Sequence, residues 1–110
     1  MKCGNNLFMS GQASLDPESE QALYENNIYE QTKYTYQNII KVLEAADMSP
    51  ANLIKTIEYV TPLGLKDYRA TSSVRKELLK EPFPSSTGII CHSLLRPEFL
   101  IEIEPFAKSF

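Results

Sequence analysis

Apolar residues recur every three or four positions in two segments of the chain, a spacing that predicts two amphipathic helices. The first helix is expected at residues 27–46, with Asn26 or Asn27 as its N-terminal cap. The second helix is expected at residues 67–79 and ends before Pro82-Phe83-Pro84, because proline cannot continue a helix.

Four other segments are short and rich in β-branched or aromatic residues, which predicts strands at residues 7–9, 53–61, 86–94 and 99–106. Residues 13–26 carry no periodic pattern and are expected to form a long loop. This order of elements favours one mixed sheet with two helices on one face. The 110 residues therefore predict a single domain of the α+β class, covering residues 1–110.

Charge and cysteine content narrow the classes of function. The net charge of −3 offers no basic surface to a phosphate backbone, so we expect no nucleic-acid partner. No apolar run approaches the roughly 20 residues of a membrane span, and the polar start of the chain is unlike a signal peptide. Cys3 and Cys91 show no metal-ligand spacing. We therefore expect a cytoplasmic protein with free thiols, no membrane partner and no metal.

Polar residues adjoin three of the predicted strands. Ser10-Gly11-Gln12 follows the first strand, and Pro84-Ser85-Ser86-Thr87-Gly88 leads into the third. Glu102 and Glu104 lie on one face of the last strand, because side chains alternate along a strand. Strands distant in sequence can bring such groups into one cleft between subunits.

Taken in order along the chain, these segments resemble the Rid family, also called YjgF or L-PSP. Leu7-Phe8-Met9-Ser10-Gly11-Gln12 is similar to the family's opening hairpin and its Ser-Gly-Gln turn, and Leu43-Glu44-Ala45-Ala46 to its first helix. Ile101-Glu102-Ile103-Glu104 resembles the closing signature, and the similarity covers nearly the whole chain. The resemblance implies a chorismate-mutase-like fold of the bacillary type, assembled as a homotrimer with clefts at the subunit interfaces.

The same resemblance implies a chemistry. Family members with the full site hydrolyse reactive enamines or imines to 2-oxo acids and ammonia, with no metal or organic cofactor. An arginine holds the substrate carboxylate, and a glutamate helps to place the attacking water. Ser10 matches the serine of the Ser-Gly-Gln turn, and Glu102 matches the glutamate.

The chain departs from that pattern at several positions. Ser86 stands where the arginine is expected, Gly88 stands where many members have a cysteine, and Ser72 falls near a position often held by asparagine. The chain also begins inside the first hairpin, without the first strand that carries a tyrosine. A charge-assisted contact from arginine is worth about 1.5–3 kcal/mol, so its loss weakens the binding of small 2-imino acids roughly ten- to a hundredfold.

Each of these positions also has a plainer interpretation. Glu102 and Glu104 can form a solvated acidic face, Ser86-Thr87-Gly88 can be a strand edge, and Ser10 can be a turn residue. Neighbouring strand residues face opposite ways, so His92 and Cys91 form no dyad. Arg96 either reaches the cleft or pairs with Glu98 in a turn.

The leading hypothesis is a deaminase that acts on a substrate such as a 2-aminoacrylate-like or 2-aminomuconate-like enamine. Glu102 would activate water, Ser10 would orient it or the substrate, and Ser86, Thr87 and Gly88 would line the pocket. The alternative is a non-catalytic trimeric protein that binds or senses a small molecule. A ribonuclease or translation inhibitor is a third option, which the acidic balance disfavours.

Overall fold

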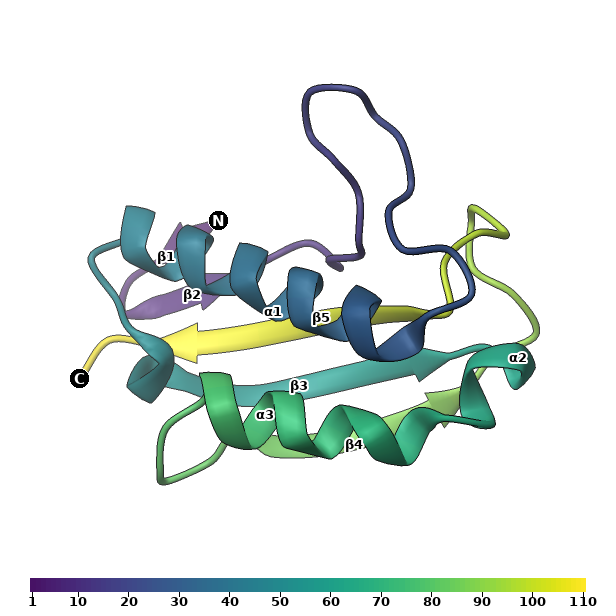
Figure 1. Ribbon diagram of the computed structural model, residues 1–110. Helices are drawn as coiled ribbons and strands as arrows, with labels where there is room; N and C mark the ends of the chain where they lie inside the picture. Colours follow the sequence, from purple (N-terminus) through teal and green to yellow (C-terminus); the bar gives the residue numbers. More distant parts are fainter.

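The computed structural model describes residues 1–110 and contains one five-stranded sheet with the strand order β1-β2-β5-β3-β4 (Figure 1). Only β3 and β4 run parallel, whereas the other neighbours are antiparallel. The strands are β1 (Lys2–Cys3), β2 (Asn6–Phe8), β3 (Leu53–Val60), β4 (Ser85–Ile90) and β5 (Ile101–Lys108). The predicted strands are present, but the third ends at Ile90, which leaves Cys91 and His92 in the following loop.

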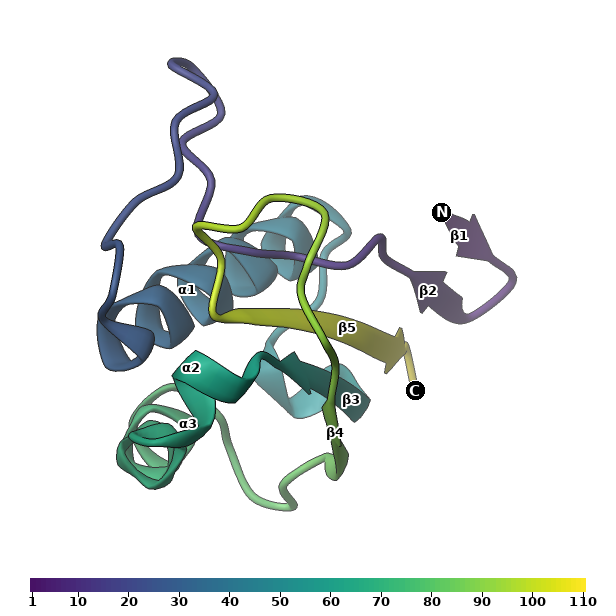
Figure 2. The same cartoon turned by 90° about the vertical axis from the view of Figure 1, so that its right-hand side faces the viewer.

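The helices cover one face of the sheet, as Figure 2 shows from the end of the strands. The first helix, α1 (Ile28–Ala45), agrees with the prediction to within one residue at each end. Asn27 caps it, and the Asn27 side chain accepts a hydrogen bond from the Glu30 backbone N–H at 3.0 Å. The α+β class, the mixed sheet and the placement of the helices are thus confirmed, and the trimer stays a prediction.

The second predicted helix, at residues 67–79, begins as a 3₁₀ turn, so its α-helical part is shorter than predicted. The chain forms α2 (Pro62–Leu65), a 3₁₀ turn η2 (Tyr68–Thr71) and α3 (Ser72–Leu78). Pro62 occupies the first turn of α2, and the Thr61 hydroxyl accepts the Gly64 N–H at 3.2 Å. This Thr-Pro pair starts a short helix. Another 3₁₀ turn, η1 (Pro50–Asn52), precedes β3.

The hydrophobic core fills the space between the helices and the sheet. Its fully buried members include Tyr36, Ile39, Leu43, Val74, Ile101 and Ile103. Along β5, Ile101 and Ile103 point into this core, so Glu102 and Glu104 point to the open face of the sheet. None of the helices combines the length and the apolar character that a membrane crossing requires.

Candidate functional site

Glu102 lines the largest cleft of the molecule, which has a volume of about 580 Å³. One wall is the segment that follows β2, with Gly11 and Gln12, and another is α1, with Asn38 and Lys41. The long loop and the loop before β5 complete it with Leu15, Pro17, Leu95, Arg96 and Phe99. The cleft therefore combines apolar walls with a carboxylate, two cations and two side-chain amides.

The sequence places Glu102 beside Gly11 through backbone pairing. Gln12 donates its N–H to the Ile103 carbonyl at 2.7 Å, and Ile103 donates to the Gln12 carbonyl at 2.8 Å. The carboxylate of Glu102 occupies the space above Gly11, where a Cβ atom would lie only 2.5 Å from Oε2. A side chain at position 11 would displace the Glu102 carboxylate, so the glycine leaves room for it.

Ser10 lies at the rim of this arrangement with an exposed side chain. Its carbonyl accepts a hydrogen bond from the Gln12 side-chain amide at 3.0 Å, which holds the turn. Gly11 and Gln12 thus line the cleft together with Glu102, whereas Ser10 precedes them outside the cleft lining, and its predicted role stays a prediction.

The two acids on the open face of β5 have different surroundings. The Tyr59 hydroxyl donates to Glu104 Oε1 at 3.2 Å, and partial burial together with this bond raises the pKa of Tyr59. The two ion pairs of the structure involve other acids, Glu58 and Glu98. Glu102 also borders a second hollow of about 330 Å³ that Tyr59 and Cys91 share. Its carboxylate is therefore open to solvent-filled space on two sides.

Arg96 pairs with Glu98 and also lines the cleft. Its Nη2 lies 3.2 Å from Glu98 Oε2, and its Nη1 donates to the Glu20 carbonyl at 2.8 Å. The Glu98 carboxylate accepts a hydrogen bond from the backbone N–H of Glu98 itself and another from the Arg96 side chain. Both bonds hold the pKa of Glu98 below its usual value. Arg96 is therefore a turn arginine that also contributes to the lining of the cleft.

The side-chain amide of Gln31 connects α1 to the long loop and to the loop before β5. It is fully buried in α1, and its Nε2 donates to the carbonyls of Tyr24 at 3.2 Å and Glu98 at 3.0 Å. Its Oε1 accepts the Leu100 N–H at 2.8 Å. One side chain therefore fixes the end of the long loop and the loop before β5 to the same helix.

Ser86, Thr87 and Gly88 do not share a pocket with Glu102 within one chain, because β3 separates β4 from β5. Ser86 points toward the helices and accepts a hydrogen bond from the Thr56 hydroxyl at 3.2 Å. Gly88 lies on the same side, 3.6 Å from the Tyr68 hydroxyl when a Cβ is built, and Thr87 points to the opposite face. Their predicted place in a cleft between subunits is not tested by a single chain and stays a prediction.

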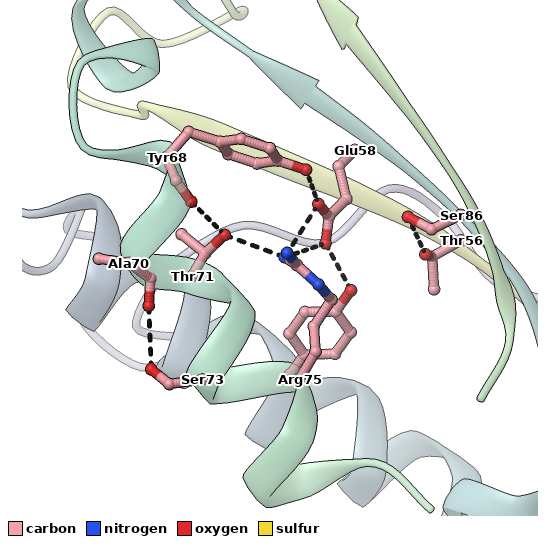
Figure 3. Close-up of polar contacts among 9 residues, drawn as sticks. Thr56, Glu58, Tyr68, Ala70, Thr71, Ser73, Arg75 and Ser86 are labelled. Atoms are coloured by element: carbon pink, nitrogen blue, oxygen red, sulfur yellow. Dashed lines mark hydrogen bonds and ion pairs between the residues drawn. The ribbon is translucent and has the colours of Figure 1, made fainter. Parts of the chain in front are cut away.

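Close to Ser86 lies a polar cluster around Glu58, which is fully buried in β3 (Figure 3). Its carboxylate accepts hydrogen bonds from the hydroxyls of Tyr36, at 2.6 Å, and Tyr68. Arg75 reaches the same carboxylate from α3, with Nη1 3.2 and 3.3 Å from its two oxygens. Nη1 also donates to the Thr71 hydroxyl at 2.9 Å.

The Glu58 carboxylate also changes the acidity of the two tyrosines. Burial, followed by the charge of Glu58, holds the pKa of Tyr36 far above its usual value of 10.0. Burial and the bond to Glu58 raise the pKa of Tyr68 to about 12. Both phenols therefore stay protonated and act as donors to Glu58.

This cluster was not predicted from the sequence, although the sequence carries a signal for it. Glu58 alternates with Thr56 and Val60, which are buried on the helix side of β3. Arg75 follows Thr71 by one helical turn, on the face that also buries Leu79. A charged residue in each of two facing buried patterns indicates a buried ion pair.

The comparisons with known proteins agree with this fold. The family model described as endoribonuclease L-PSP matches residues 1–109. The chain belongs to this family, which is the Rid or YjgF family. A RutC family protein of Pyrococcus horikoshii is 33% identical over 107 residues, which cover 97% of this chain and 82% of that protein.

Two further Rid relatives are similar over most of the chain. Human 2-iminobutanoate/2-iminopropanoate deaminase is 29% identical over 101 residues, which cover 92% of this chain and 71% of that protein. The crystal structure of RidA from the Antarctic bacterium Psychrobacter sp. PAMC 21119 superposes with a TM-score of 0.89 at 27% identity. That superposition covers 99% of this chain and 85% of the other.

Proposed function

We propose that this protein is a Rid-type deaminase that hydrolyses a reactive enamine or imine and releases ammonia. The observation that carries the proposal is the carboxylate of Glu102, which lies over Gly11 at the wall of a cleft without an ion-pair partner. The human relative, named as an imine deaminase, supports the same kind of reaction.

The proposed reaction needs only water and a group that moves protons. An enamine first tautomerises to its imine, and Glu102 removes a proton from a water molecule as the oxygen attacks the imine carbon. Glu102 gives this proton to the imine nitrogen, which yields a neutral carbinolamine. The hydroxyl proton of the carbinolamine then passes through Glu102 to the amino group, the C–N bond breaks, and ammonia leaves as the carbonyl forms. Ser10, beside Gly11, would orient the water or the substrate.

The proposed assembly is a homotrimer in which subunits complete the site. On the open face of the sheet, the exposed Phe8 meets Phe106 edge to face, with ring centroids 6.3 Å apart. Ile89 is also exposed, and all of β4 is uncovered. Burying these apolar groups would stabilise an assembly. Light scattering after size exclusion tests this, and a mass of one or two chains would contradict it.

The decisive experiment follows ammonia release from freshly generated 2-aminoacrylate and 2-aminomuconate. The protein should accelerate release from at least one substrate, and Glu102→Gln should lower the rate about 100-fold or more, because general acid–base catalysis contributes on that order. Glu104→Gln is the matched control on the same strand face and should keep the activity. Equal rates for Glu102→Gln and the unchanged protein would contradict the proposed role.

A second candidate function is that of a non-catalytic protein that binds a small molecule. Ser86 favours it, because its uncharged hydroxyl is bonded to Thr56 where the family resemblance places an arginine. Binding of a neutral ligand that Glu102→Gln leaves intact, together with no acceleration on either substrate, would support this candidate.

A further inference from the structure

A separate pocket of about 230 Å³ lies between α3 and the strands β3 and β4. Its polar lining comprises Thr56, Ser72, Arg75, Lys76 and Ser86, and apolar side chains form the remaining wall. No acidic residue lines it. The lining thus offers two cations and three hydroxyls, a composition that suits a small anion with an apolar tail.

Arg75 is only partly used by the cluster around Glu58. All of its hydrogen bonds, to Glu58 and Thr71, leave from Nη1. A guanidinium carries five N–H donors in a fixed plane, so those on Nε and Nη2 remain available. The side chain is 23% exposed, whereas that of Glu58 is fully buried. One edge of the guanidinium therefore anchors the residue while donors remain on the pocket side.

The anchoring makes Arg75 a preorganised donor. Its Cζ lies 5.6 Å from the centroid of the Tyr68 ring, which holds the guanidinium plane in addition to Glu58. A side chain that is already fixed loses little conformational entropy when a ligand binds. Glu58 in turn receives hydrogen bonds from Tyr36 and Tyr68, so its charge is stabilised by groups other than Arg75.

We propose that Arg75, with the hydroxyls near Ser86, forms a carboxylate-binding subsite that determines the substrate class of this protein. Arg75 would supply the charge that position 86 lacks, from α3 instead of from β4. The proposal rests on the proposed deaminase function and its trimer, because β3 separates this pocket from Glu102 within one chain. The group that this lining fits is a carboxylate next to a short apolar chain.

The test is a titration with 2-oxobutanoate, the stable product that hydrolysis of a 2-iminobutanoate gives, followed by NMR on the labelled protein. Binding should shift the signals of Ser86 and of the Arg75 side chain. Butanone, which lacks the carboxylate, should bind at least tenfold more weakly. Inorganic phosphate is titrated in parallel, and tighter binding of phosphate than of 2-oxobutanoate would overturn the assignment of a carboxylate.

The variants separate a ligand-binding arginine from one that only neutralises Glu58. Glu58→Gln/Arg75→Met removes both charges without leaving either unpaired, and it should weaken 2-oxobutanoate binding about tenfold or more. Glu58→Gln alone keeps the Arg75 charge but loosens its anchor, so it should still bind 2-oxobutanoate more tightly than the double variant does. Arg69→Met removes an exposed arginine outside the pocket and should have no effect. Unchanged affinity in the double variant overturns the proposal.

The titration also distinguishes this proposal from the proposed reaction. If 2-oxobutanoate binds through Arg75 but no enamine is hydrolysed, the subsite stands and the deaminase proposal fails. If hydrolysis proceeds and the double variant keeps its KM for the imino acid, the deaminase proposal stands and the subsite fails.

Discussion

Glu58 and Glu102 lie on neighbouring antiparallel strands of one sheet, but their carboxylates have opposite surroundings. Glu58 faces the helices, is fully buried and accepts hydrogen bonds from Tyr36, Tyr68 and Arg75. Glu102 faces the open side, borders two hollows and forms no ion pair. A carboxylate that is saturated with donors contributes to structure, whereas an uncommitted one at a cleft is available to handle water.

The largest expected effect is a loss of stability when the ion pair between Glu58 and Arg75 is broken. Arg75→Met leaves the Glu58 charge buried without its cation, and removing one partner of a buried pair costs about 3–5 kcal/mol of unfolding free energy. Urea denaturation measures this loss, and Glu58→Gln/Arg75→Met should recover much of it. A loss below about 1 kcal/mol, the typical size for an exposed pair, would show that Glu58 does not need Arg75.

Moving the Glu102 carboxylate should cost activity and little stability. Gly11→Ala introduces a Cβ into the space of Oε2, and the flexible end of Glu102 can turn away. Because a displacement of about 1 Å can cost a hundredfold in rate, we expect kcat/KM for an accepted enamine to fall roughly ten- to a hundredfold. Urea denaturation of the same variant checks that the fold is retained. Full activity in Gly11→Ala would contradict the placement of Glu102 in the reaction.

The tyrosines of the Glu58 cluster predict a loss of stability at alkaline pH. Their pKa values are raised in the folded state, so their contribution is complete below the unfolded value of 10.0. For Tyr68 it is lost as the pH rises from there toward its folded pKa of about 12. Unfolding free energy measured between pH 9 and about 12 should fall less steeply in Tyr68→Phe, which has no proton to lose. Identical slopes would contradict the prediction.

The smallest expected effect is that of Glu102→Gln on stability. The residue is partly exposed and unpaired, so its unfolding free energy should change by no more than about 0.5 kcal/mol. Thermal unfolding of this variant beside Glu104→Gln, which loses part of the bond to Tyr59, provides the comparison. A large loss of unfolding free energy in Glu102→Gln would show that Glu102, like Glu58, stabilises the fold.

Some features of this fold and site could be predicted from the sequence, and others could not. The helix at residues 28–45 and the pairing of Ser10-Gly11-Gln12 with Glu102 follow from periodicity and family resemblance, because both depend on contiguous patterns. The short helix α2 depends on the cap at Thr61 and on Pro62, which are local signals without any periodic pattern. The pocket at Ser86 depends on Arg75, which belongs to α3 and not to β4. The sequence of β4 alone does not reveal that an arginine from another element lies beside Ser86.

Gln31 has a consequence for the mobility of the cleft. Its one amide holds the backbone at Tyr24, Glu98 and Leu100, which belong to segments more than 70 residues apart at their extremes. The long loop and the loop before β5 therefore cannot open independently of each other. Hydrogen exchange should report their protected amides as one cooperative unit with the start of α1, so that the entrance breathes as a whole rather than by the fraying of a single loop.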